Sequence, residues 1–247
     1  GIITDEDFQN ATILEVEGKR ILEKLENAKI AICPGFQGQT RSGQITTLGR
    51  GGSDLSAIAI GIAVEAKEVE IYSDVNGIYT ADPRIVPDAV KLDYISYAEM
   101  LELAGNGAKV LNLRCVQLAA KHNIVIHARS SFEQTKGTYV IGDEEIMKKG
   151  LNKLIISGIT GSQNEARITL VGVDGTNDSS AKFFKRIAEE GVNVNVFNQA
   201  LVGGGKMDIS LIVKDEDLPK VIDVCNELKQ PLKAKRTIVR GNIGKVS

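Results

Sequence analysis

A glycine-rich loop followed by a long apolar run is the feature that most constrains this chain. The loop spans residues 46–54 (TTLGRGGSD) and combines bare backbone, a guanidinium, a hydroxyl and a carboxylate. The apolar run at 55–64 predicts a buried helix, with Ser53 or Asp54 as its N-cap. A helix N-terminus has unpaired N–H donors and about half a positive charge, so it stabilises an anion that lies next to it. The loop therefore predicts a site for a phosphoryl or carboxylate group.

Three other interpretations of this loop are a nucleic-acid-binding tail, a Walker P-loop and a purely structural turn. An RGG-type nucleic-acid tail is disfavoured, because the Gly-Arg-Gly-Gly sequence is not repeated and lacks interleaved aromatic residues, and because the net charge of the chain is −2. A Walker P-loop is excluded, since the pattern G-x-x-x-x-G-K-[ST] does not occur in the sequence. A structural glycine turn without a ligand remains the alternative.

Length and composition fit an enzyme or a sensor with one large or two modest domains, since 43% of the 247 residues are hydrophobic and 25% are charged. The cysteines, Cys33, Cys115 and Cys225, are too few and too far apart for a disulfide framework, and none has metal-ligand spacing with His122 or His127. We expect buried thiols in a reducing compartment, the cytoplasm. No apolar run or signal peptide indicates a membrane partner, and the near-neutral charge gives no reason to expect nucleic acid.

Residues 28–150 alternate between predicted strands and helices. The expected strands are 29–33, 68–72 and 123–128, and the expected helices are 55–64, 95–103 and 108–121. Such strand–helix–strand units build parallel sheets with right-handed crossovers, and ligands gather at the carboxyl ends of their strands. Residues 35–38 (GFQG), Ser73 and Asp74 would lie at that edge.

Residues 151–247 have a different order of elements, which predicts a second domain beginning at residue 151. The expected order is a strand at 166–173, a helix at 179–190, strands at 192–197 and 207–213, a helix from about Glu216 capped by Asp215, and a strand at 236–239. This βαββαβ order is ferredoxin-like, a topology that serves many small-ligand sensors as well as other roles.

Several ordered motifs make the chain resemble the aspartate kinases of the amino-acid kinase superfamily, followed by an ACT regulatory domain. Besides the loop, the segments that carry the resemblance are 34–38 (PGFQG), 72–84 (YSDVNGIYTADPR), 95–100 (ISYAEM) and 107–111 (GAKVL). The resemblance implies an α/β fold: part of an αβα sandwich with a mainly parallel sheet at 1–150, then a ferredoxin-like ACT domain at 151–247.

The activity implied by the resemblance is transfer of the γ-phosphoryl group of ATP to the side-chain carboxylate of L-aspartate. The product is 4-phospho-L-aspartate, a precursor of lysine, threonine and methionine. Mg²⁺ is expected with the nucleotide phosphates, and no metal site made by protein groups alone is expected. Two alternatives stay open: a kinase for another substrate, such as glutamate, acetylglutamate or UMP, and a non-catalytic amino-acid sensor on a degenerate kinase.

The resemblance also implies site residues. The catalytic residues would be Asp54, which holds a lysine ammonium in place, and Lys109, expected at the start of a helix and facing the phosphates. Those near the amino-acid substrate would be Thr47, Arg50, Gly51, Gly52 and Ser53, and those around the nucleotide Ser73, Asp74, Tyr79, Arg84 and Lys109. Arg50 suits a carboxylate because its planar fork can bind one bidentately. His122 and His127 have no activating partners in the sequence, so structural roles are expected for both.

The sequence also departs from the family pattern. The amino-terminal Lys-Phe-Gly-Gly motif and an upstream substrate-binding glutamate are absent, and residues 243–247 resemble the first strand of a second ACT domain. We therefore expect a fragment truncated at both ends and inactive, or nearly so, by itself.

The ACT segment predicts an effector site and an assembly. The family's Asp-x-Pro-Gly turn is replaced by 174–180 (DGTNDSS), which still leads into a helix N-terminus that can receive an amino acid's carboxylate. The effector contacts implied by the resemblance are Asn177, Asp178, Ser179 and Gln199, the last expected after a strand, and the effector would be lysine or threonine. The alternative is an ACT unit that only dimerises or scaffolds. By resemblance, a homodimer or higher homo-oligomer through the ACT domains is expected.

Overall fold

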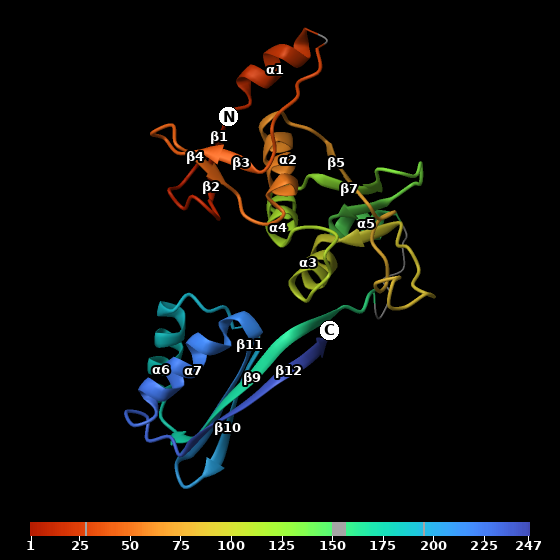
Figure 1. Cartoon of the computed structure of the whole chain (residues 1–247). Helices are drawn as coiled ribbons and strands as arrows, with labels where there is room; N and C mark the ends of the chain where they lie inside the picture. Colours follow the sequence, from red (N-terminus) through yellow and green to blue (C-terminus); the bar gives the residue numbers. More distant parts are fainter. Residues whose placement is uncertain (28, 150–156, 195) are drawn as a thin grey trace. The chain divides into compact units, whose positions relative to one another are not determined.

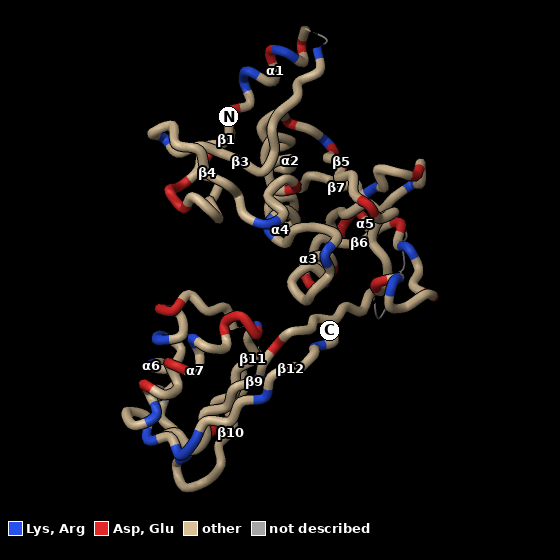
Figure 2. Tube along the Cα trace, viewed as in Figure 1, with Lys and Arg blue, Asp and Glu red and all other residues tan. Residues whose placement is uncertain are grey.

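The computed structural model describes residues 1–27, 29–149, 157–194 and 196–247. It divides into two compact units, Gly1–Thr160 together with Ser247, and Gly161–Val246 (Figure 1). The domain boundary predicted from the sequence falls at residues 150 and 151, which lie outside the described residues. Within the described part of the chain, no helix has both the length and the apolar character needed to cross a bilayer. Acidic and basic residues are interspersed over both units (Figure 2).

The larger sheet of the first unit has the strand order β5-β7-β8-β6. Its strands are β5 (Glu68–Ser73), β6 (Tyr94–Ser96), β7 (Val125–Ser130) and β8 (Thr138–Ile141). The pairs β5–β7 and β6–β8 are parallel, whereas β7–β8 is antiparallel. The prediction of a mainly parallel sheet therefore holds for this sheet, because two of its three pairings are parallel.

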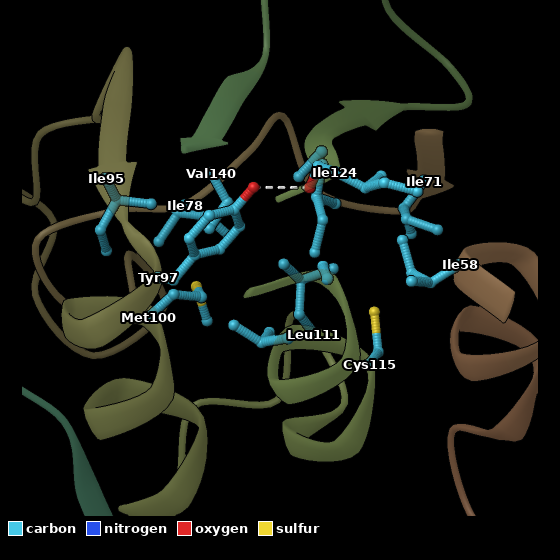
Figure 3. Packing of buried hydrophobic residues seen from close by; sticks show 14 of the residues in the cluster. Ile58, Ile71, Ile78, Ile95, Tyr97, Met100, Leu111, Cys115, Ile124 and Val140 are labelled. Atoms are coloured by element: carbon cyan, nitrogen blue, oxygen red, sulfur yellow. Dashed lines mark hydrogen bonds between the residues drawn. The ribbon is translucent and has the colours of Figure 1, made fainter. Parts of the chain in front are cut away.

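The core of the first unit lies between this sheet and the helices α2 (Gly52–Ala63), α3 (Tyr97–Gly105) and α4 (Leu113–His122). Figure 3 shows buried side chains from helices and strands meeting there, among them Ile58, Met100, Cys115 and Val140. The hydroxyl of Tyr97 donates to the backbone carbonyl of Ile124 at 2.7 Å, so the one polar atom at its tip is satisfied. A capping box of Ser96 and Glu99 begins α3. The short helix α5 (Asp143–Lys148) follows β8.

A smaller sheet, of order β2-β1-β3-β4, precedes α2 along the chain. It is formed by β1 (Ile2–Thr4), β2 (Ile13–Val16), β3 (Gln37–Gln39) and β4 (Ile45–Thr47), with α1 (Lys19–Glu26) after β2. The hydroxyls of Thr4 and Thr46 share a buried hydrogen bond of 2.7 Å. Because β4 leads directly through the glycine-rich loop into α2, this sheet fixes where the loop begins.

A predicted strand and the start of a predicted helix in the first unit are wrong. Residues 29–33 do not form a strand, and Ile30 and Ile32 are 91% and 94% exposed. An apolar run becomes a strand only when a neighbouring strand completes its hydrogen bonds, and none in the described part of the chain pairs with it. The helix predicted at 108–121 begins only at Leu113, because the Asn112 side chain caps it by accepting from the backbone N–H groups of Arg114 and Cys115.

The second unit has the predicted βαββαβ order and a fully antiparallel sheet of order β10-β11-β9-β12. Its elements are β9 (Gly161–Asp174), α6 (Asn177–Glu189), β10 (Val196–Gly203), β11 (Lys206–Lys214), the 3₁₀ turn η1 (Asp215–Asp217), α7 (Leu218–Leu228) and β12 (Arg236–Val246). Its own buried cluster includes Phe183, Ile209 and Val221. This is the ferredoxin-like fold.

Details of the second unit differ from the prediction. The strand expected at 192–197 corresponds to β10, which spans Val196–Gly203 and so lies further along the chain, and the turn with positive φ at Gly203, Gly204 and Gly205 joins it to β11. Asp215 does not cap a helix but lies in η1, and α7 follows it.

Residues 243–246 belong to β12 in this structure. Ile243 pairs with Glu165, and Val246 pairs with Gly161, so β12 runs antiparallel to β9 as far as the first residue of β9. The strand predicted at 236–239 is therefore longer than its apolar core, because backbone pairing with β9 extends it past Gly241 and Gly244.

Candidate functional site

The glycine-rich loop ends in a helix N-terminus that no side chain caps. Gly49 and Gly51 have φ values of 77° and 71°, and α2 begins at Gly52 with Gly51 as its N-cap. The prediction that Ser53 or Asp54 is the N-cap is wrong, because both lie inside the first helical turn. The first N–H groups of α2 therefore have no side-chain acceptor from the cap residue, as an anion site requires.

Asn112 holds the loop against the start of α4. Its side-chain amide donates to the carbonyl of Arg50 at 2.8 Å, and its backbone N–H donates to Asp54 Oδ2 at 3.4 Å. A Cβ on Gly51 would lie 2.6 Å from the Asn112 amide nitrogen, so only glycine fits there. Asn112 thus fixes the backbone that carries Arg50 and the carboxylate of Asp54 together.

Burial raises the pKa of Asp54, and the hydrogen bonds from Asn112 and Ser53 oppose this only in part. A carboxylate that is partly removed from water is stabilised by a nearby cation more strongly than an exposed one. Next to it, burial raises the pKa of the Cys115 thiol, and the charge of Asp54 adds to the effect. Cys115 is therefore a neutral, inert side chain, and Asp54 is the charged group of this part of the site.

The predicted substrate residues divide into exposed and structural groups. Arg50 and Ser53 are exposed, and among the described residues no partner engages the Arg50 guanidinium. Thr47 instead supports the fold, because its hydroxyl donates to the carbonyls of Phe8 and Gln9, both at 3.2 Å. Arg50 is thus available for an anionic ligand.

The segment 34–38 lies beside the first turn of α2. The backbone N–H of Phe36 donates to Ser56 Oγ at 3.2 Å, and this hydroxyl donates to the carbonyl of Ser53 at 2.8 Å. The N–H of Leu48 donates to the carbonyl of Phe36 at 2.9 Å. Two glycine-containing loops that are separate in the sequence therefore meet at one helix N-terminus.

A second group of predicted residues surrounds Arg84. The guanidinium of Arg84 donates to both carboxylate oxygens of Asp82, at 3.0 and 2.8 Å, and these hydrogen bonds lower the pKa of Asp82 to about 2. Lys109 lowers it further through its charge, and Asp74 raises the pKa of Arg84 in the same way. The charges of Asp74, Asp82, Arg84 and Lys109 therefore interact: Lys109 acts on Asp82, and Asp74 acts on Arg84.

The remaining nucleotide residues frame this group. Ser73 ends β5, and its Oγ accepts from the N–H of Val75 at 3.4 Å. Tyr79 forms an isolated antiparallel bridge with Lys91. Lys109 is exposed and lies in the loop between α3 and α4, so its predicted place at the start of a helix is wrong.

One loop serves both groups. The α3–α4 connection carries Lys109 toward the Arg84 group and, three residues later, Asn112 toward Arg50 and Asp54. Sequence reasoning missed Asn112, although an asparagine before an apolar helical run is an N-cap signal.

Arg114 was missed for a different reason. It donates to the carbonyl of Leu48 at 3.0 Å and to that of Ala11 at 2.8 Å, and so ties the glycine-rich loop at Leu48 to the segment around Ala11. Its partners are 66 and 103 residues away, so no local sequence signal could reveal this role.

The predicted effector residues lie in the second unit. Ser179 is buried, and its hydroxyl and that of the N-cap Thr176 are 3.0 Å apart, whereas the exposed Asp178 pairs with Lys182 at 2.7 Å. Asn177 begins α6, but its side chain lies outside the described residues. Gln199 is exposed within β10 rather than after a strand. Among described side chains, no hydrogen bond joins Gln199 to Asp178 or Ser179.

Comparison with known proteins decides the family. The model of the amino acid kinase family matches residues 1–130, which include the glycine-rich loop, the Arg84 group and α4. This chain belongs to the amino acid kinase family.

Relatives of this amino acid kinase support the match over its full length. It is 40% identical over 250 residues to the aspartokinase of Mycolicibacterium smegmatis, covering 100% of this chain and 59% of the relative. It is 42% identical over 233 residues to that of Helicobacter pylori, covering 94% and 56%. The chain thus spans less than two thirds of the curated relatives it matches.

Among solved structures, aspartokinase III of E. coli in complex with aspartate and ADP matches with a TM-score of 0.80 and 28% identity, over 99% of this chain and 55% of that one. Clostridium acetobutylicum aspartate kinase matches with a TM-score of 0.75 and 28% identity, over 92% and 52%. These matches confirm the predicted α/β fold.

Proposed function

We propose that this chain belongs to an aspartate kinase, which transfers the γ-phosphoryl group of ATP to the side-chain carboxylate of L-aspartate and yields 4-phospho-L-aspartate and ADP. The observation that carries the proposal is the α2 N-terminus, which has no side-chain cap and places an exposed Arg50 beside a half-buried Asp54. Support comes from relatives named aspartokinase at about 40% identity across the chain and from the E. coli enzyme solved with aspartate and ADP.

The α2 end would bind the amino acid. The guanidinium of Arg50 can take one carboxylate of aspartate through two parallel hydrogen bonds, with the Ser53 hydroxyl and the α2 N-terminus, which has no side-chain cap, close by. Asp54 would orient an ammonium group between the acceptor carboxylate and the phosphates. Such a role suits a carboxylate whose environment is poor in water.

The Arg84 group would bind the nucleotide. Lys109 and Arg84 are exposed cations that can neutralise phosphate charge, and Ser73, Asp74 and Tyr79 would surround the nucleoside end. Phosphoryl transfer depends mainly on positioning and charge neutralisation, which these residues supply. Mg²⁺ bound with ATP would neutralise phosphate charge, and the carboxylate of Asp74 would suit it because this ion prefers oxygen ligands.

The second unit would regulate the enzyme. We propose that lysine or threonine binds at the start of α6 near Asp178 and Ser179, with Asn177 and Gln199 as further contacts, and that this unit mediates a homodimer or higher homo-oligomer in the cytoplasm. The E. coli enzyme is known in complex with lysine and aspartate, which supports an amino-acid effector. Calorimetry that detects neither amino acid binding to the protein would contradict this part of the proposal.

The proposal is tested by MgATP-dependent acyl-phosphate formation, trapped with hydroxylamine, on this chain and on any longer natural protein that contains it. Aspartate, glutamate and acetylglutamate are offered separately, with Arg41→Lys as a control at an exposed turn residue. We expect little or no activity from this chain alone. In the longer protein we expect activity with aspartate as the one acceptor, lost in Asp54→Ala and Lys109→Ala, and a raised KM for aspartate in Arg50→Lys. Activity confined to another acceptor would make the chain a kinase for that substrate, and inactivity of the longest form would favour the sensor.

A further inference from the structure

Three side chains of the kind that bind metals cluster on the larger sheet of the first unit. They belong neither to the α2 N-terminus nor to the Arg84 group. Glu68 and Glu70 alternate along β5 with Val69 and Ile71, which belong to the helix-covered core, so the two carboxylates share the opposite face. His127 on the parallel strand β7 stands in register with Glu70. Residues 59 positions apart in the sequence therefore meet through strand pairing.

The spacing of the ligand atoms suits one metal ion. His127 Nδ1 lies 2.8 Å from Glu68 Oε1 and 3.5 Å from Glu70 Oε1, and the three atoms all lie within 4.8 Å of one another. Two ligands at about 2.0–2.1 Å from a tetrahedral ion are roughly 3.3 Å apart, between the two measured distances. Only small side-chain movements would be needed to bind an ion.

The imidazole of His127 is held in place for this role. Nε2 lies 2.7 Å from the carbonyl oxygen of Lys136, which can only accept, so Nε2 carries a proton and Nδ1 is the atom that faces the carboxylates. The ring is 4% exposed and stacks on Tyr139 with centroids 3.9 Å apart. A metal-binding histidine commonly donates its second N–H to a backbone carbonyl in this way.

We propose that Glu68, Glu70 and His127 form a binding site for a first-row divalent cation of the Zn²⁺ type. One imidazole and two carboxylates suit such an ion, whereas Mg²⁺ prefers oxygen ligands alone, so the site is distinct from any that serves the nucleotide. The glutamate side chains are each 39% exposed, which leaves room for water as a further ligand. The metal would take the place of the hydrogen bond between His127 Nδ1 and Glu68 Oε1, and the proton of that hydrogen bond would go to solvent.

Arg129 competes for the same carboxylate. Its guanidinium donates to Glu70 Oε1 at 2.6 Å and lowers the pKa of Glu70. Since both cations are attracted to one oxygen, removing the guanidinium should strengthen metal binding. A purely structural His127–Glu68 hydrogen bond predicts no such gain.

The test is equilibrium dialysis of the full chain, freed of metal by a chelator, against Zn²⁺ in excess Mg²⁺, with the Co²⁺ absorption spectrum as a second readout. We expect one Zn²⁺ per chain, with affinity reduced at least about tenfold in Glu68→Gln and in His127→Gln, and increased in Arg129→Gln. Glu68→Gln changes an exposed residue without changing its size and should leave the fold intact. Its metal affinity therefore tests the site even if His127→Gln fails to fold. His122→Gln, at the exposed end of α4, is the matched control and should bind as the wild type does.

Three outcomes would overturn the proposal. They are no retention of Zn²⁺ or Co²⁺ by the wild type, equal retention by Glu68→Gln, and loss of the metal only in Cys33→Ser, which would place it on the half-buried thiol.

Discussion

At the scale of the residue, Asp54 combines the charge that we propose for catalysis with a cost to the fold. Because burial raises its pKa, the folded state keeps a proton that the unfolded state has released, and stability is lost as the pH rises from the unfolded to the folded pKa. Asp54→Asn removes the charge but keeps an oxygen for the Asn112 N–H. We expect this variant to be at least as stable as the wild type at neutral pH, and to lack the loss of stability between those two pKa values, although it would lose phosphoryl transfer.

Urea unfolding of both proteins at neutral and weakly acidic pH measures this effect. Asp82→Asn is the control, and its stability should change in the opposite direction, because Arg84 lowers the pKa of Asp82 to about 2. That carboxylate stabilises the fold above its unfolded pKa, and the contribution disappears as the pH falls toward the folded value. A loss of more than about 1 kcal/mol in Asp54→Asn at neutral pH would contradict the expectation.

Gly51 shows a steric requirement at the same site. Its φ of 71° disfavours any side chain, and an added Cβ would lie 2.6 Å from the amide of Asn112. Gly43 has a φ of 85° but open space around it, so Gly43→Ala carries the backbone cost alone. We expect unfolding free energy to fall by about 1 kcal/mol in Gly43→Ala and roughly twice that in Gly51→Ala. Equal losses in the two variants would show that the contact with Asn112 is unimportant.

At the scale of the element, the start of α4 joins helix capping to the site. Asn112→Ala removes the acceptor for two N–H groups of α4 and the donor to Arg50, and should cost about 1 kcal/mol. Asn112→Asp keeps the cap but cannot donate to the Arg50 carbonyl. We therefore expect Asn112→Asp to recover most of the stability in urea unfolding while the KM for aspartate stays raised in both variants. Full recovery of KM in Asn112→Asp would argue against this link.

Helices and strands with a strong local sequence pattern could be predicted. Short strands that form only by pairing with distant strands could not. The helix α2 and the strand β5 were predicted within a few residues, because each combines a dense apolar run with clear ends. The strands β1 to β4 have only three or four residues each and depend on pairing across the sheet, so no periodicity revealed them. The candidate site follows the same rule: the motif predicts Arg50 and Asp54, whereas Asn112 and Arg114 make their hydrogen bonds with residues far away in the sequence.

At the scale of the whole molecule, the second unit has what independent folding requires. All four strands of its sheet and both of its helices fall within Gly161–Val246, and they enclose their own buried cluster. We expect a fragment of these residues to unfold cooperatively in urea, with the mixed helix and strand signal of its βαββαβ fold in circular dichroism. A Phe183→Ala fragment, which lacks the largest fully buried side chain, should unfold at a lower urea concentration. A gradual transition without a midpoint would contradict this expectation.

The exposed segment 29–33 has a consequence for handling the protein. Ile30 and Ile32 present apolar side chains to solvent beside backbone groups that no described strand pairs with. Short, apolar, β-prone segments that are exposed and unpaired can form strand pairs with other chains. Aggregates should therefore form in concentrated solutions, and light scattering should increase with time. Thioflavin fluorescence of such samples would rise in the wild type and remain low in Ile32→Lys, because the added charge opposes strand pairing between chains. Colloidal stability, rather than folding stability, would then limit crystallisation and storage of this chain.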